Sequence, residues 1–119
     1  MQWIRTGAAL AALGVAAGAF GAHGLKDQVG PDLLDVWKTG AFYHIVHALA
    51  LVVFGTLCTL HKPTPPKAVG WLFAIGILLF SGSLYLLVLT KVRALGAITP
   101  LGGLSFIAAW TWLAISIRE

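Results

Sequence analysis

Residues 68–90, AVGWLFAIGILLFSGSLYLLVLT, decide the fold, because 23 successive residues carry no charged side chain. A helix needs about 20 apolar residues to cross the hydrocarbon core of a bilayer. Three further uncharged segments of similar length, 6–25, 39–61 and 94–117, fill most of the remaining chain, and all twelve charged residues lie outside the four segments. We therefore predict an all-α integral membrane protein, a four-helix bundle with short loops in which residues 1–119 form one transmembrane domain.

The charge of the chain favours a membrane over a nucleic acid as partner. Only 10% of the 119 residues are charged, against about 25% in a soluble domain. The formal net charge is +4, but the basic residues are scattered one or two to a loop. Lysine and arginine next to a membrane segment normally face anionic lipid headgroups. We expect membrane lipid as a partner and no nucleic acid.

Short connections make successive helices antiparallel neighbours, so the termini and the 62–67 turn share one side of the membrane. Loops 26–38 and 91–93 share the other side. Within loop 26–38, Gly30-Pro31 breaks the chain, and we expect residues 32–38 to form a separate short turn in the membrane interface. The positive-inside rule leaves the orientation open, because each side has four basic residues: Arg5, Lys62, Lys67 and Arg118 against Lys26, Lys38, Lys91 and Arg93.

Two segments carry glycines in a pattern that predicts close helix contact. Small residues at helical spacing let two backbones approach within a membrane. The partner is either another helix of the chain or a second copy, so a homo-oligomer is possible. The expected packing residues are Gly7, Gly14, Gly18, Gly21, Gly102 and Gly103.

Polar side chains of all four segments lie toward the side of loop 26–38. His44 and His47 are three residues apart and are expected to share a helix face. At 1.5 Å per residue they lie about 8–13 Å from the start of segment 39–61. We predict one polar cluster in this membrane half, made of His23, Tyr43, His44, His47, Ser81, Ser83, Tyr85 and Thr99.

Three interpretations of this cluster remain open. In the first, the cluster is a structural hydrogen-bond network, because polar groups in lipid need hydrogen-bond partners. Ionisable residues within a membrane are also candidates for a ligand, ion or proton site. The third is a metal site. His23, His44 and His47 could supply three imidazole ligands, as in some zinc sites, but no carboxylate or thiolate within the membrane supports them. We predict no metal site, no catalytic residues and no cofactor.

Four blocks of sequence are similar to the signature blocks of a known family. They are GAFGAHG at 18–24, TGAFYHIVHALAL at 39–51, LFSGSLY at 79–85 and ITPLGGL at 98–104. The chain resembles domain-of-unknown-function family 423, small membrane proteins that include transmembrane protein 256, over nearly its whole length. The resemblance implies a multi-pass four-helix protein, in the inner membrane for bacterial members. It brings no established activity and no assigned catalytic residues.

The sequence contains no clear catalytic or metal-binding motif, so we predict the function from what remains. We expect a non-enzymatic interaction, assembly or lipid-binding module with its polar cluster in one membrane half. The alternative is an oligomeric transport protein for a small solute or for protons, which would use His44 and His47. That alternative requires several copies, because four short helices enclose too little space for a pore.

Overall fold

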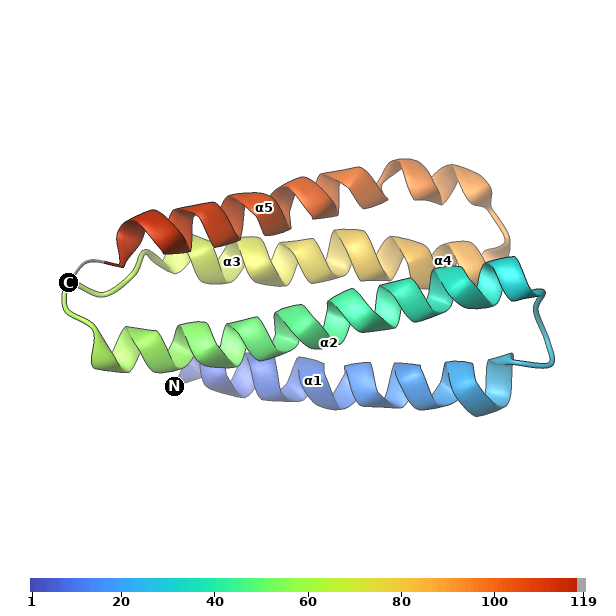
Figure 1. Cartoon of the computed structure of the whole chain (residues 1–119), viewed down its shortest axis with the longest axis horizontal. Helices are drawn as coiled ribbons and strands as arrows, with labels where there is room; N and C mark the ends of the chain where they lie inside the picture. The colour runs from blue at the N-terminus through green and yellow to red at the C-terminus, as the bar shows by residue number, and fades with distance from the viewer. Residues whose placement is uncertain (118–119) are drawn as a thin grey trace.

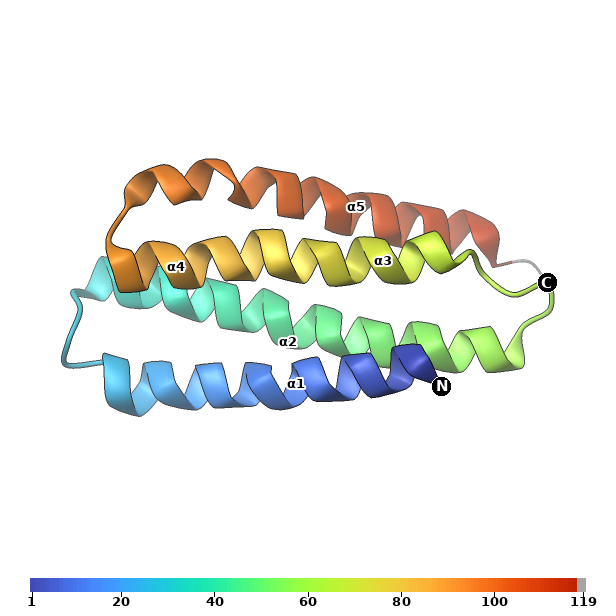
Figure 2. The same cartoon turned by 180° about the vertical axis from the view of Figure 1, so that it is seen from behind.

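The computed structural model describes residues 1–117, and over that range it consists of helices and their connections. The chain runs up and down four times (Figures 1 and 2). Four helical rods are long and apolar enough to cross a membrane: Gln2–Leu25, Pro31–Leu60, Lys67–Thr90 and Arg93–Ser116. The predicted all-α membrane architecture is confirmed. Arg118, counted above on the side of the termini, lies outside the described residues.

Prolines and glycines set the ends of the second rod, α2 (Pro31–Leu60). Gly30 precedes it in an extended conformation, and Pro31 occupies the first turn, where its missing N–H costs no hydrogen bond. The expected separate turn at residues 32–38 is wrong, because these residues form the first turns of α2 itself. Leu33 and Trp37 are buried there, so this face of the turn packs against the rest of the protein.

The other rods each contain a break in regular α-helix. The first is α1 (Gln2–Phe20), followed by the π-helical turn Gly21–Leu25. The third joins α3 (Lys67–Gly76), the π-helical turn Ile77–Ser81 and α4 (Gly82–Thr90), and ends at Lys91 in a left-handed conformation. The fourth begins with the 3-10 turn Arg93–Ala97 and continues as α5 (Thr99–Ser116).

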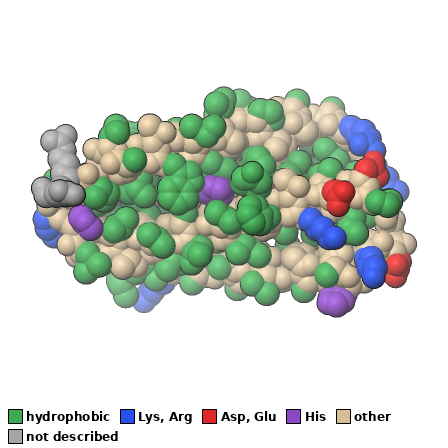
Figure 3. Space-filling view, viewed as in Figure 1, with side chains coloured by type: hydrophobic (Ala, Val, Ile, Leu, Met, Phe, Trp, Pro, Cys, Tyr) green, Lys and Arg blue, Asp and Glu red, His purple; other side chains and the backbone are tan. Residues whose placement is uncertain are grey.

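The rods lie side by side in the order α1, α2, α3 with α4, and α5 (Figures 1 and 2). The two middle rods are the most enclosed, since 44% of the apolar stretch of each is buried, against 17% for the first rod and 22% for the fourth. Charged side chains gather at the two ends, and hydrophobic side chains cover much of the surface between them (Figure 3). This distribution matches a protein whose middle is surrounded by lipid.

Glycines allow α1 to approach α2 closely. A Cβ atom on Gly7 would lie 2.8 Å from the Ala48 carbonyl oxygen, and one on Gly14 would lie 2.7 Å from Ile45 Cγ1. Gly21 faces the Trp37 indole in the same way. Gly18 departs from this pattern, because a Cβ there would have nothing within 4 Å.

The two glycines expected to pack in the last segment also differ. A Cβ on Gly102 would collide with the backbone of Phe80, which lies in the π-helical turn of the third rod. A Cβ on Gly103 would meet only the Phe80 ring, at 3.9 Å, an ordinary contact. Gly102 therefore forms the close contact between α5 and the third rod.

Candidate functional site

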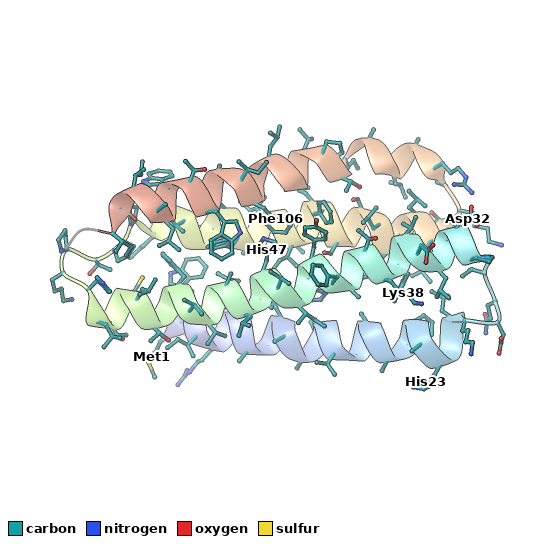
Figure 4. All side chains as sticks on the ribbon, in the orientation of Figure 1. Met1, His23, Asp32, Lys38, His47 and Phe106 are labelled. Atoms are coloured by element: carbon teal, nitrogen blue, oxygen red, sulfur yellow. The ribbon has the colours of Figure 1, made fainter. Side chains whose placement is uncertain are left out.

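His47 lies about midway along α2 and points toward α5 (Figure 4). Its Nδ1 atom is 2.8 Å from the backbone oxygen of Tyr43, and its Nε2 atom is 3.0 Å from the indole nitrogen of Trp110. The imidazole stacks on the Phe106 ring with centroids 3.5 Å apart and planes at 7°. Only 4% of the residue is exposed. Two residues of α5 thus hold the ring on both an edge and a face.

The two partners of His47 fix the position of its ring proton. A carbonyl oxygen only accepts hydrogen bonds, so Nδ1 carries the hydrogen that Tyr43 receives. An indole N–H only donates, so Nε2 is unprotonated and accepts from Trp110. We therefore assign His47 as the neutral Nδ1–H tautomer, with both nitrogens occupied.

This assignment is testable by nitrogen NMR of the histidine rings. In protein reconstituted in bilayers at neutral pH, we expect His47 to show a protonated Nδ1 and an unprotonated Nε2. Trp110→Phe removes the indole donor and should shift the Nε2 resonance of His47, while the resonances of His44 serve as the internal control. A parent protein in which Nε2 of His47 carries the hydrogen would contradict the assignment.

A groove runs along the outside of His47 between α2 and α5. It encloses about 430 Å³, within the usual range of about 300–1,000 Å³ for ligand sites. The same face of the molecule shows a histidine at its centre in Figure 3, at the position labelled His47 in Figure 4. Most of the wall is aromatic or aliphatic, and the lining residues are Tyr43, Val46, His47, Phe80, Gly103, Phe106, Ile107 and Trp110.

His44 takes part in a different contact. Its Nδ1 atom is 2.8 Å from the Tyr85 hydroxyl of α4, and its ring packs over Gly14 of α1. Its Nε2 atom is buried and has no hydrogen-bond partner within residues 1–117. The backbone of Leu10 lies beside the ring, but outside hydrogen-bond geometry. His44 of α2 thus contacts both α1 and α4, and its Nε2 atom makes no hydrogen bond within the described residues.

The serines of the third rod divide between two neighbours. Ser81 is fully buried and donates to the Gly40 carbonyl of α2 at 2.7 Å. The Ser83 hydroxyl lies 2.6 Å from that of Thr99 in α5. Residues two apart on a helix point in nearly opposite directions, which explains why these serines bond to different rods.

The residues of the expected single polar cluster are therefore divided among four separate contacts. His44 and His47 differ by about 60° around α2, from the 3.6-residue period, and α2 has neighbours on several sides. That angle suffices to direct His44 toward α1 and α4 and His47 toward α5. His23 takes part in none of these contacts, because it is exposed at the outer edge of the first rod (Figure 4). Tyr43 is 38% exposed and lines the groove.

Sequence reasoning missed the residues of α5 that hold His47. Neither Trp110 nor Phe106 was among the residues predicted for the polar cluster. The pair is spaced by four residues, which places both rings on one helix face. That spacing was the available signal, but it does not show which neighbouring helix the face meets.

No group of three metal-ligating side chains is brought together within residues 1–117. The three histidines considered above as zinc ligands lie in different places, since His23 is exposed while His44 and His47 have separate partners. The arrangement offers hydrogen bonds and an apolar groove.

Known proteins similar to this chain are membrane proteins of bacteria. A UPF0382 membrane protein of Bacillus subtilis, YwdK, is 47% identical over 115 residues, which cover 96% of this chain and 94% of the relative. A UPF0382 membrane protein of Staphylococcus haemolyticus is 44% identical over 114 residues, covering 96% and 93%. No solved structure matches the chain. Residues 17–103 match the family described as protein of unknown function, DUF423, and the chain is a multi-pass membrane protein that belongs to this family.

Proposed function

We propose that this protein is a non-enzymatic membrane module that binds a lipid chain in the groove between α2 and α5. The observation that supports the proposal is the groove itself, which is mostly apolar, encloses about 430 Å³ and has a histidine at its floor. The proposed location is the bacterial inner (plasma) membrane, because helical bundles span that membrane while outer-membrane proteins are barrels.

The walls of the groove suit an apolar chain that enters from the bilayer. Ile107 and Trp110 are 64% and 44% exposed, so the groove is open along the side that lipid would cover. Phe80 and Phe106 provide flat apolar surface at its floor. An acyl chain that lies against these rings makes many dispersion contacts with them. These contacts are closer than those that the chain makes with mobile neighbouring lipids.

The polar groups in the groove favour binding over catalysis. Both nitrogens of His47 are already hydrogen-bonded, so the ring has no free position at which to take a proton from a substrate. The Tyr43 hydroxyl remains the polar group able to reach a ligand from the groove wall. A lipid carbonyl near this hydroxyl would gain one hydrogen bond and a fixed orientation.

Proton-linked transport is the second candidate, and the unpartnered Nε2 atom of His44 favours it. Together with the Tyr85 hydroxyl, this atom forms a buried polar pair between three rods. The pair does not line the groove of His47, so transport would use another part of the molecule. Proton flux into proteoliposomes that depends on His44 would separate this function from lipid binding.

Photolabelling tests lipid binding in the groove. A photoreactive fatty acid in phosphatidylcholine nanodiscs should label Val46 and Ile107, on opposite walls, more strongly than exposed lipid-facing residues such as Leu13. Gly103→Leu places a side chain in the groove and should remove most of this excess. Gly18→Leu makes the same change where α1 has open space and should leave it intact.

The comparison of the groove walls with the lipid-facing Leu13 decides the result. Equal labelling of Val46, Ile107 and Leu13 in the parent protein would mean that the groove holds no more lipid than the rest of the surface. Excess labelling that persists in Gly103→Leu would equally contradict the proposal.

A further inference from the structure

A second cavity lies at the end of the molecule that holds the termini, away from the groove of His47. It encloses about 560 Å³ between the connection of α2 to α3 and the end of α5. Prolines stiffen one wall, and an indole, an isoleucine and two hydroxyl groups complete it. The lining residues are Pro63, Thr64, Pro66, Trp112, Ile115 and Ser116.

The charged residues around this end are all basic within the described part of the chain. Lys62 precedes Pro63 and Lys67 follows Pro66, so a lysine flanks each end of the wall that these prolines form. Arg5 lies in the first turn of α1, whose N-terminus is on the same side (Figure 1). No aspartate or glutamate of residues 1–117 is found there.

The opposite end has a different balance. Its basic residues are accompanied by Asp27, Asp32 and Asp35, and Arg93 forms an ion pair with Asp32 at 3.3 Å. Both ends therefore carry lysine and arginine, but they differ in the acidic residues that lie beside them. Only the end with the cavity leaves its positive charge uncompensated by described acidic side chains.

We propose that this cavity binds the headgroup of an anionic phospholipid, such as phosphatidylglycerol. Lysine ammonium groups attract phosphate, and basic residues at a membrane surface attract anionic lipid. The Ser116 hydroxyl already donates to the Leu113 carbonyl, so its oxygen is available to accept from a glycerol hydroxyl. Trp112 is 41% exposed and provides the indole that suits headgroup depth.

The proposal does not depend on the groove of His47. Ile107 and Trp110 line the groove, while Trp112, Ile115 and Ser116 line the cavity, and these sets lie on different faces of α5. Each site is testable without the other. Loss of one type of binding leaves the other proposal standing.

Native mass spectrometry of the full chain tests the proposal. From nanodiscs with equal amounts of phosphatidylglycerol and phosphatidylcholine, we expect the parent protein to retain phosphatidylglycerol selectively. The double variant Lys62→Gln/Lys67→Gln should lose this selectivity. Lys26→Gln/Lys91→Gln removes the same charge at the opposite end and should keep it. No selectivity in the parent, or equal loss in both double variants, would overturn the proposal.

A third variant separates a cavity from a charged surface. Thr64→Phe leaves both lysines in place and fills the cavity from an exposed position of the turn, so selectivity should be lost again. Retention equal to that of the parent would show that the lysines act without the cavity. Thermal stabilisation by inorganic phosphate as large as that by short-chain phosphatidylglycerol would show that a free anion suffices. Either result overturns the assignment of a lipid headgroup site.

Discussion

Gly102→Ala should destabilise the protein by about 3 kcal/mol or more, whereas Gly103→Ala should not, although the two positions are adjacent in α5. A Cβ atom added at Gly102 would collide with the backbone nitrogen and Cα of Phe80. Overpacking of a closely packed site usually costs about 1–3 kcal/mol and sometimes more. Here the colliding atoms belong to a backbone and have no rotamer through which to move aside, which places the cost at the upper end.

Gly103→Ala is the matched control for this prediction. Its Cβ would lie 3.9 Å from the Phe80 ring, and alanine improves helix propensity over glycine by about 1 kcal/mol. Unfolding by sodium dodecyl sulfate in mixed micelles, followed by circular dichroism, measures both free energies of unfolding. Equal stability of the two variants would contradict the close contact of α5 with the third rod.

The architecture was predictable because a bilayer imposes strict lengths and penalises charge. Uncharged runs such as 68–90 had no alternative to a membrane helix. The proline-rich turn at 62–67 ended α2 where expected. Residues 32–38 were assigned wrongly because their polarity suggested a surface turn, whereas Leu33 and Trp37 bury one face and continue the helix. Polarity on one side of a helix does not exclude burial on the other.

The candidate site was less predictable because depth alone does not place a side chain. The helical rise predicted how far each polar residue lies from a membrane surface, but it did not predict which neighbour the residue faces. His44 and His47 illustrate this, since they meet different rods. The π-helical turn Ile77–Ser81 adds a further shift of register in the third rod, and no residue pattern in that segment announced it.

The groove lies where His47 of α2 meets Trp110 of α5, and predicting this contact requires knowledge of how the two helices are rotated relative to each other. A sequence gives the face of each helix, but pairing two faces needs the tertiary structure. Glycine positions are the exception, because a missing side chain indicates close approach before the partner is known. They were therefore the most useful packing signal in the sequence, although Gly18 has no close neighbour within the chain.

Gly7→Leu should prevent α1 from packing on α2, whereas Gly18→Leu should leave the folded chain nearly as stable as the parent. At Gly7 a Cβ would lie 2.8 Å from the Ala48 oxygen and from the Val52 backbone nitrogen. A leucine there must separate two helices whose backbones are in close contact, at a cost of about 3 kcal/mol or more. At Gly18 the side chain enters open space, and leucine is the better helix former by somewhat less than about 1 kcal/mol.

Thermal unfolding in detergent micelles compares the two leucine variants, and Gly7→Ala serves as a milder form if Gly7→Leu does not fold. Because the alanine Cβ already meets the backbone of α2, we expect Gly7→Ala to lower the unfolding temperature as well. The mass of each detergent-solubilised variant is measured in parallel. A loss of stability in Gly18→Leu equal to that in Gly7→Leu, together with a reduced copy number, would mean that Gly18 packs against a second copy of the chain. Unchanged stability in Gly7→Ala would instead contradict the contact between α1 and α2, since an added methyl group cannot be accommodated there without moving one helix backbone.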